Sequence, residues 1–396
     1  MPVCLTDREF DRRRGVIRNK MEERSLEALC VFSPAQVFYL TGFAFIATER
    51  PICAVYRPDK DMVSLFVPLL EVEHAEEAHV DLVRTYDEYP GEKHPMECLV
   101  QMLSELGVEG GSIGVDSDGY AGGYGYLGAR LSDLIRGDVH LVKELIERLT
   151  WIKSDEEIAL VRESCKWAEL AHRLLQRYSA HGLVETDISF RASHEASMEM
   201  VRALGPEYRS MHFGSFPAQA DYRGQIGAHS AVPHSIATNV ALSAGDVLVT
   251  GAAAEVGGYL SELERTMILG QPTSEQERFF KLMLGMQDLA FETIRPGVRC
   301  LDVDRALMDY FDEYGIREYW RHHTGHGIGY GMHEAPFLDV GDDTVIQPGM
   351  ILTVEPGLYV PGFAGFRHSD TIAVTGAGME ILTSYPRDLE SLVIPA

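Results

Sequence analysis

The feature of this sequence that most constrains its fold is a change of pattern near residue 150. Before it, short apolar runs such as "LCVF" and "MVSLFVPLL" alternate with stretches of helical spacing such as "HPMECLVQMLSELG". At the change, Ser154 is followed three residues later by Glu157, a capping-box signature that opens a long amphipathic helix. The 396 residues also exceed the roughly 100 to 200 of one typical domain. We therefore predict two domains, 1–150 and 151–396.

The two halves predict different fold classes. Residues 1–150 read as a small α/β domain, with a hairpin through "VYRPDKDMV" and a helix over "YGYLGARLSDLI". After the long helix, β runs dominate, and two helices are expected between about 275 and 314. The predicted strands lie in "MHFGSF", "GDVLVTGAAAEVGGYL", "ERTMILG", "GMILTVEPGLYV" and "SDTIAVTG". Helices with mainly antiparallel strands predict an α+β domain.

Charge and hydropathy narrow the kind of partner. Sixty acidic and 35 basic residues give a formal charge of −25, which repels nucleic acid and anionic membrane surfaces. The start of the chain lacks the apolar core of a signal peptide, and no window approaches the ~18 apolar residues of a membrane helix. We expect a cytoplasmic protein that acts on a small molecule, without a nucleic-acid or membrane partner.

Two motifs that often mark enzymes do not fit their contexts. The run "VLVTGAAAEVGG" at 247–258 is similar to the start of a dinucleotide-binding unit, but the following "YLSELERTMILG" predicts a strand where that unit needs a helix. The "GGSIG" around Ser112 precedes a strand, whereas a nucleophilic serine of the G-x-S-x-G type follows one. Neither motif therefore predicts the activity.

A histidine-rich segment, "HHTGHGIGYGMHEAP" at 322–336, is the strongest candidate for chemistry. His322 and His326 could share a helical face, but the glycines at every second position from 325 to 331 disfavour a helix. We expect a glycine-rich loop that presents imidazoles to a cleft. The alternative is a loop of ordinary surface histidines.

Six motifs then mark a resemblance that covers most of the chain. They are "PHS" at 233–235, "GDVLV" at 245–249, "GGYLSELERT" at 257–266, "GHGIGYGMHEAP" at 325–336, "GMILTVEPGLYV" at 349–360 and "GFRHSD" at 365–370. In this order they resemble the pita-bread superfamily of prolidase, aminopeptidase P, methionine aminopeptidase and creatinase. The resemblance implies an α+β pita-bread catalytic domain preceded by a smaller α/β creatinase-type N-terminal domain.

The resemblance also implies a metal site, and this chain departs from it. Peptidases of the superfamily hold two divalent metals with two aspartates, one histidine and two glutamates. Those positions fall here on Gly251, Glu262, His326, Glu355 and Ser369. Glycine and serine offer no carboxylate, and two dications a few ångströms apart repel each other unless anions bridge them. We predict no bound metal, with one weakly bound divalent ion at Glu262, His326 and Glu355 as the alternative.

The pattern that remains resembles the metal-free creatinase branch, which hydrolyses a C–N bond of a guanidinium in a small molecule. "LERT" places Glu264 as in that branch, and "ERP" at 49–51 is similar to the place where creatinase presents an arginine, here Arg50, in a site shared between domains or subunits. Asp339 and Ser369 differ from the creatinase pattern, so creatine itself is not expected. We predict a small cationic amidine, guanidine or amide as substrate.

General chemistry supports roles for several of these residues. Two carboxylates, Glu264 and Glu355, can accept a planar guanidinium or amidinium, and His234 in "PHS" can protonate the leaving nitrogen near neutral pH. A simple ion pair of Glu264 with Arg265 or another surface base is the alternative for that acid. The predicted catalytic residues are His234, Glu264, His326 and Glu355, and the predicted substrate contacts are Arg50, Glu262, His322 and His333.

Two other functions remain open at this stage. One is an Xaa-Pro peptidase of the prolidase or aminopeptidase P type with an altered metal site. The other is a catalytically inactive relative that only binds a partner or small molecule. Metal content and the effect of a chelator on prolyl-dipeptide turnover separate the peptidase from the metal-free hydrolase. By analogy with creatinase and prolidase we expect a homodimer.

Overall fold

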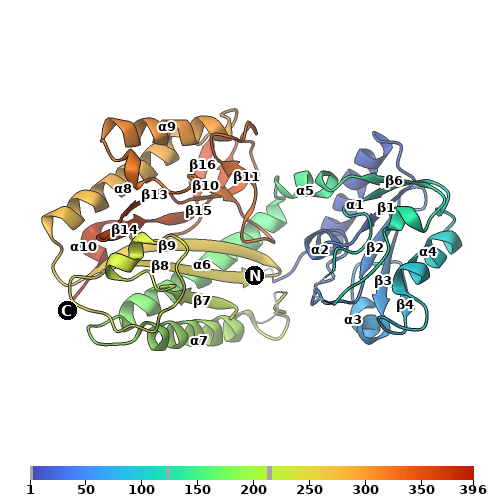
Figure 1. Cartoon of the computed structure of the whole chain (residues 1–396), viewed down its shortest axis with the longest axis horizontal. Coiled ribbons are helices and arrows are strands. Elements are labelled where there is room, and N and C mark those ends of the chain that lie inside the picture. Colours follow the sequence, from blue (N-terminus) through green and yellow to red (C-terminus); the bar gives the residue numbers. More distant parts are fainter. Residues whose placement is uncertain (1–2, 123–124, 212–215) are drawn as a thin grey trace. The chain divides into compact units, whose positions relative to one another are not determined.

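The computed structural model describes residues 3–122, 125–211 and 216–396. The chain divides into two compact units, Leu5–Thr150 and Trp151–Ala396, the second of which also includes Val3 and Cys4 (Figure 1). Each unit has its own central sheet. None of the helices formed by the described residues combines the length and apolarity needed to span a bilayer.

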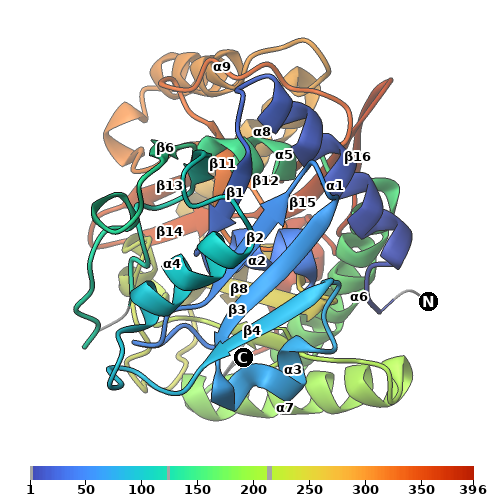
Figure 2. The same ribbon diagram turned by 90° about the vertical axis from the view of Figure 1, so that its right-hand side faces the viewer.

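The unit Leu5–Thr150 is built on a six-stranded sheet in the order β4-β3-β2-β1-β5-β6 (Figure 2). Its strands are β1 Ala28–Val31, β2 Cys53–Arg57, β3 Met62–Pro68, β4 Leu82–Tyr86, β5 Ser112–Val115 and β6 Asp138–Leu141. Its helices are α1 Asp7–Glu22, α2 Pro34–Thr41, α3 Val72–Ala75, α4 Pro95–Glu105 and α5 Glu144–Thr150. The central pairs β1–β2 and β2–β3 are antiparallel and the outer three are parallel. The predicted hairpin is therefore confirmed as β2–β3.

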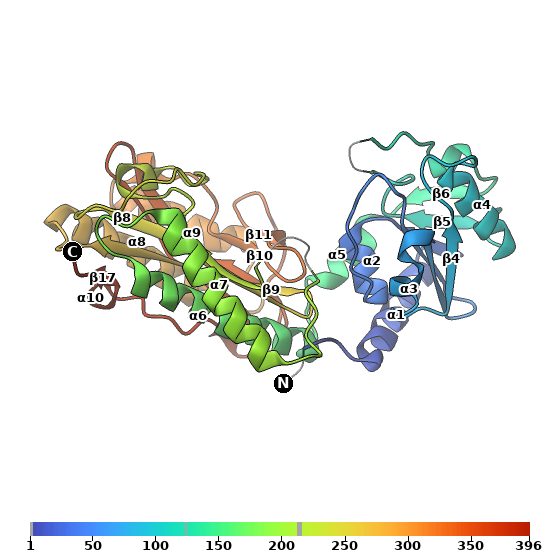
Figure 3. The ribbon, with the colours of Figure 1, turned by 90° about the horizontal axis from the view of Figure 1, so that it is seen from below.

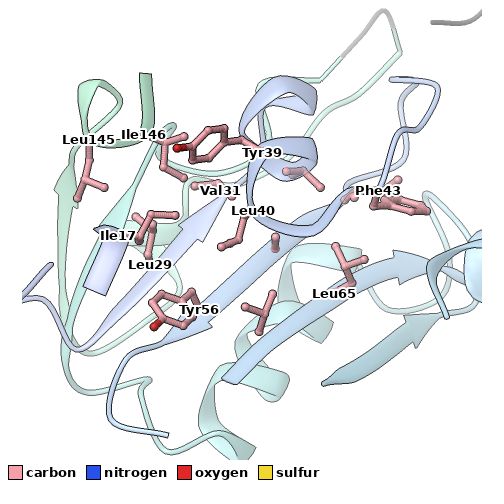
Figure 4. Packing of buried hydrophobic residues seen from close by; sticks show 14 of the residues in the cluster. Ile17, Leu29, Val31, Tyr39, Leu40, Phe43, Tyr56, Leu65, Leu145 and Ile146 are labelled. Carbon is pink, nitrogen blue, oxygen red and sulfur yellow. The ribbon is translucent and has the colours of Figure 1, made fainter. Parts of the chain in front are cut away.

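Both faces of this sheet are buried, and alternate residues of each strand serve opposite faces. Leu29 and Val31 of β1 point into one apolar cluster with Tyr56, Leu65 and α1, α2 and α5 residues (Figure 4). Ala28 and Cys30 point into a second cluster, which includes Met96, Leu99, Met102 and Leu103 of α4. Continuous apolar runs such as "LCVF" follow from this two-sided burial.

The helix predicted over 124–135 is wrong. The described residues of this segment contain only a short 3-10 turn, Leu131–Asp133. Gly125 adopts a φ of 93°, in the left-handed region that a right-handed helix excludes. Leu127, which would belong to the buried face of such a helix, is 84% exposed.

The unit Trp151–Ala396 contains five α-helices and eleven strands among its described residues. The helices are α6 Asp155–Tyr178, α7 Glu185–Leu204, α8 Ser274–Thr293, α9 Cys300–Glu313 and α10 Leu389–Leu392. The first strands are β7 Ala218–Asp221, β8 Val247–Val256, β9 Tyr259–Leu269, β10 Gly325–Gly327, β11 Glu334–Leu338 and β12 Ile351–Val354. The remaining strands are β13 Gly357–Val360, β14 Ala364–Arg367, β15 Ser369–Thr375, β16 Gly378–Ile381 and β17 Val393–Ile394.

In the part of the chain that the structure describes, the main sheet of this unit has nine strands, in the order β11-β10-β12-β15-β9-β8-β7 with β16 and β17 beside β15 and β9. Its pairs are antiparallel except β9–β17. Helices α6 and α7 pack against each other and on β7 (Figure 3), and α8 and α9 pack against each other (Figure 1). The predicted α+β architecture is confirmed. The predicted strand "MHFGSF" falls largely on 212–215, outside the described residues.

Local sequence signals explain two key elements. The capping box at the start of α6 is confirmed, because the Ser154 hydroxyl accepts from the Glu157 N–H and the Glu157 carboxylate accepts from the Ser154 N–H. Strands β8 and β9 form a hairpin through Gly257 and Gly258, whose φ angles of 57° and 86° suit a tight hairpin turn. The hairpin also explains why "VLVTGAAAEVGG" is not a dinucleotide-binding turn.

Candidate active site

Two glutamates of β9 project from the side of the sheet opposite to α6. The hydroxyl of Ser261, also on β9, lies 2.7 Å from the hydroxyl of Ser164 on α6. Because successive side chains of a strand alternate between faces, Glu262 and Glu264 point the other way. Glu264 pairs across the ladder with Gly251 of β8, which places no side chain beside that carboxylate.

His326 reaches the same site from β10, a short strand between β11 and β12. Its neighbouring glycines are required by close packing, because a Cβ at Gly325 would lie 2.1 Å from the Thr353 carbonyl oxygen and one at Gly327 would lie 2.6 Å from the Ala335 oxygen. The expectation that an irregular loop presents every histidine is therefore wrong for His326. The loop alternative of surface histidines is also wrong for His326, which is fully buried.

His326 and Glu355 form an ion pair at the centre of the site. Nε2 of His326 lies 3.0 Å from Oε1 of Glu355, which follows the end of β12. Burial opposes the charged imidazole, but the Glu355 carboxylate and the charge of Glu262 raise the pKa of His326 to about 9. Burial likewise opposes the charged carboxylate, and the His326 contact nevertheless holds the pKa of Glu355 well below its usual range.

Among the described residues, Glu262 forms no ion pair of its own, although the nearby charge of His326 favours its ionised form. Its Oε1 accepts a hydrogen bond of 2.7 Å from the hydroxyl of Ser369. Burial and the neighbouring carboxylates Glu355 and Glu264 raise the pKa of Glu262 to about 7. A cation that bound here would therefore relieve repulsion among three acids.

Glu264 is held by two arginines that sequence reasoning did not assign. Arg367 of β14 donates from Nε to Oε2 and from Nη2 to Oε1 at 2.6 Å. Arg223 donates from Nη2 to the same Oε1 at 2.8 Å. Arg265 as the partner is wrong, because its guanidinium pairs with Asp370 at 2.8 Å on the other face of β9. The alternative of an ion pair with another base agrees with the contacts that Glu264 makes to Arg223 and Arg367. The acceptor atoms predicted to clamp a substrate guanidinium are therefore occupied by the protein itself.

The other predicted histidines surround this cluster. The His333 ring stacks on His326 at 3.6 Å between centroids, and burial with the nearby His326 charge lowers the pKa of His333 to about 4. His234 is exposed, and its charge acts on His333. His322 is turned inward, with Nε2 2.8 Å from the hydroxyl of Tyr359. The catalytic role of His234 and the substrate contacts of His322 and His333 remain predictions.

The glycine-rich segment before His333 is organised by one carboxylate. Glu334 accepts from the Gly331 N–H at 2.6 Å through Oε1 and from Lys153 Nζ at 2.9 Å through Oε2. Lys153 is buried and precedes α6, so the pair ties the histidine segment to the start of the unit's longest helix.

Arg50 belongs to the unit Leu5–Thr150. There its guanidinium contacts Glu49 at 2.6 Å and Glu88 at 2.7 Å. Its contact with a substrate remains a prediction.

The structure adds four residues to the predicted set: Asp221, Arg223, Tyr359 and Arg367. Arg367 stands in the quoted motif "GFRHSD", so its proximity to the acids was open to inference, whereas Arg223 and Asp221 lie outside every motif. Burial raises the pKa of Asp221 to about 6, Arg223 counteracts this rise and Glu264 adds to it.

The donors present fit one divalent ion and not a pair. Ligand atoms of Glu262, His326 and His333 lie within 4.8 Å of one another, as do those of Glu262, Glu264 and Glu355. Among the described residues, Nε2 of the buried His326 has no well-aligned hydrogen-bond acceptor despite its contact with Glu355, so it is available as a ligand. A second ion lacks donors, because Gly251 has no side chain and Ser369 offers only a hydroxyl that already bonds Glu262.

Comparisons with known proteins agree with this architecture. The sequence model of metallopeptidase family M24 matches residues 159–376, and that of the creatinase/prolidase N-terminal domain matches residues 13–163. The chain is 27% identical over 372 residues to the Xaa-Pro dipeptidase of Pyrococcus horikoshii, covering 93% of this chain and 96% of that one. It is 28% identical over 373 residues to an uncharacterized peptidase of Bacillus subtilis, covering 94% and 98%. The solved structure of an Xaa-Pro dipeptidase from Bacillus anthracis gives a TM-score of 0.80 at 26% identity, covering 97% and 99%.

Fold and site together define a hydrolase of C–N bonds with a pita-bread catalytic domain. The chain belongs to metallopeptidase family M24 and carries a creatinase/prolidase N-terminal domain. This confirms the predicted superfamily and fold. The relatives named above are peptidases, so the metal-free hydrolase of amidines or guanidines is not supported as the main function. The alternative of an Xaa-Pro peptidase is better supported.

Proposed function

We propose that this protein hydrolyses the C–N bond that precedes proline in a small peptide and that it uses one divalent metal ion. The observation that carries the proposal is the convergence of Glu262, His326 and Glu355 around the unaligned Nε2 of the buried imidazole. Likeness to Xaa-Pro dipeptidases over most of the chain supports the substrate class.

A divalent ion held by Glu262, His326 and Glu355 would act as a Lewis acid toward the scissile carbonyl. The residues around it would orient the ion, protonate the leaving group and contact the substrate. Glu262, whose carboxylate is oriented by the hydroxyl of Ser369, would serve as a ligand of the ion. Exposed His234 is suited to protonate the leaving prolyl nitrogen. His333 is neutral at pH 7 because its pKa is lowered, so it can donate or accept a hydrogen bond to the substrate without adding charge.

A second candidate is the metal-independent hydrolysis of a small cationic amidine, guanidine or amide. One observation favours it: Arg223, Arg367 and the protonated His326 offset most of the carboxylate charge without any metal. Against it stands the occupation of Glu264 by two guanidinium groups, which leaves a substrate cation no free bidentate acceptor there.

Metal analysis combined with turnover separates the two candidates. The purified protein is dialysed against cobalt(II), its metal content is measured by mass spectrometry, and hydrolysis of a prolyl dipeptide is followed with and without a chelator. The proposal expects about one ion per chain and chelator-sensitive turnover. Ammonia or urea release from a guanidino or amidine compound that persists in chelator supports the second candidate. Binding of these compounds without any product indicates an inactive relative.

The cytoplasmic location and the homodimer are further proposals. The strongly acidic composition suits a protein that does not bind polyanions. A dimer is expected from the creatinase and prolidase resemblance, with Arg50 as the residue that a partner subunit would contribute. Light scattering tests the dimer, and the Arg50→Ala variant tests the shared site, since a dimeric site predicts a raised KM in that variant.

A further inference from the structure

The acid cluster of this site lacks the ligands for a second metal ion. The carboxylate nearest β8, that of Glu264, is nevertheless paired with cations. Glu264 is 4% exposed and would be costly to bury as an unpaired charge. Its Oε1 accepts from two guanidinium groups, those of Arg367 and Arg223. Arg367 alone, with two hydrogen bonds to both carboxylate oxygens, already provides a bidentate pair. Arg223 is therefore an additional cation.

Arg223 reaches Glu264 from an unusual backbone position. It follows β7 with a φ of 50°, a left-handed conformation that disfavours a residue with a Cβ. Its side chain is 39% exposed, whereas that of Glu264 is 5% exposed. A strained residue that extends a partly exposed guanidinium into a buried acid cluster is typical of a functional constraint.

The guanidinium of Arg223 lies close to Gly251, which has no side chain. Gly251 pairs with Glu264 on one side and with Asp221 on the other, so the three positions form one row on the same face of the sheet. A Cβ at Gly251 would lie 3.6 Å from the same Oε1 atom that accepts from Arg223. Arg223 also acts on Asp221, since its charge favours the ionised form of that carboxyl. Acids and guanidinium groups thus alternate along Asp221, Arg223, Glu264 and Arg367.

We infer that Arg223 takes the place of the second metal ion: its guanidinium, rather than a divalent cation, offsets the acid cluster beside Gly251, and the site holds at most one metal. The inference rests on the proposed function for the single ion at Glu262, His326 and Glu355. Carboxylates restored at positions 251 and 369 would therefore not suffice for a second ion, because a guanidinium and a dication repel each other at such short range.

The test measures metal content and not activity. Cobalt(II) per chain is determined by mass spectrometry, after dialysis, for the wild type and for three variants. The Gly251→Asp/Ser369→Glu double variant restores both missing carboxylates while Arg223 remains. A triple variant adds Arg223→Met, and its matched control adds Arg223→Lys, which keeps the charge. We expect at most one ion in the wild type, the double variant and the lysine control, and two ions in the triple variant.

Two ions in the wild type or in the double variant overturn the inference. A folded triple variant that still holds at most one ion also overturns it, because Arg223 is then not what excludes the second. Circular dichroism and the unfolding temperature establish folding. If the triple variant does not fold, the single variants decide: Arg223→Met should tighten cobalt(II) binding about tenfold and Arg223→Lys about twofold at most, by removal or retention of one nearby charge. Equal affinities in both single variants overturn the inference.

Failure of the proposed function is distinguishable from failure of this inference. A wild type that binds no cobalt(II) and does not cleave a prolyl dipeptide contradicts the proposed single-metal peptidase. The inference still stands in that case if the triple variant gains two ions and the lysine control does not.

Discussion

Nε2 of His326 lies 3.0 Å from Oε1 of Glu355, and both side chains are buried. The pair joins β10 to the end of β12, two neighbouring strands of the main sheet. Each partner stabilises the charged form of the other, which is why the pKa of the imidazole rises despite burial, while that of the carboxyl falls despite burial. The acid–base state of the whole site therefore depends on this contact.

The Glu355→Gln variant should lose activity while it keeps its fold. The amide cannot carry the negative charge that holds His326 and that a metal ion would need, so we expect kcat/KM for a prolyl dipeptide to fall by about 10² to 10⁴. Glu380→Gln is the matched control, because Glu380 is an exposed acid of the same unit paired with Arg162. A Glu355→Gln variant as active as this control contradicts the assigned role.

Metal affinity should rise with pH between about 7 and 9. Burial and neighbouring acids raise the pKa of Glu262 to about 7, and the acids around His326 raise its pKa to about 9 against the effect of burial. Below these values a proton occupies each ligand atom and must leave before a metal binds. We expect cobalt(II) affinity to increase at least about tenfold per pH unit in this range. Calorimetric titration at pH 6, 7, 8 and 9 measures it.

The control for this pH dependence of cobalt(II) affinity is the Glu262→Gln variant, which lacks the group with the lower of the two pKa values. In that variant the affinity for cobalt(II) should be weaker at every pH from 6 to 9, and it should change less between pH 6 and 7 than in the wild type. An affinity that is the same at pH 6 and pH 9 in the wild type indicates that neither Glu262 nor His326 binds the ion.

Much of the fold could be predicted because its signals are local. The capping box of α6, the apolar runs of β1 to β3 and the successive strands β8 and β9 each depend on residues adjacent in sequence. The helix over 124–135 failed for the opposite reason. Its helical spacing was present, but Gly125 takes a left-handed conformation and Leu127 finds no core to pack against.

The site was harder to predict, because its partners come from distant strands. The acids of β9 and the histidine of β10 stood in ordered motifs, whereas the pairing of Glu264 with Arg223 and Arg367 depends on neighbours more than 40 residues away in sequence. No periodicity marks Arg223 in the sequence, and only the ladder of β7, β8 and β9 brings its neighbour Asp221 opposite Gly251. Charge partners of this kind require the three-dimensional register.

Loss of the Lys153–Glu334 ion pair should destabilise the histidine segment. Lys153 Nζ lies 2.9 Å from Glu334 Oε2, with side chains 2% and 16% exposed. Lys153→Met leaves a largely buried carboxylate without its cation, so we expect the free energy of unfolding to fall by about 3 kcal/mol. Urea unfolding measures it. Lys281→Met is the control, because Lys281 is 74% exposed and its pair with Glu277 lies on the surface. Equal losses in both variants would contradict the structural role of Lys153.

Two histidines that are buried in neutral form should each contribute a loss of stability on acidification, against the opposite contributions of Glu262 and His326, whose pKa values are raised. Burial and the nearby charge of Arg265 lower the pKa of His172 to about 3, and the same causes hold the pKa of His368 well below its usual range. Below pH about 6.5 these two imidazoles are protonated in the unfolded chain but not in the folded chain. Each should therefore lower the free energy of unfolding by about 1.4 kcal/mol per pH unit. Urea unfolding at pH 7.5 and 5.5 measures this slope. His368→Leu should reduce it, whereas His194→Leu, at an exposed position on α7, should not. A slope unchanged by His368→Leu indicates that this imidazole is already protonated in the folded protein.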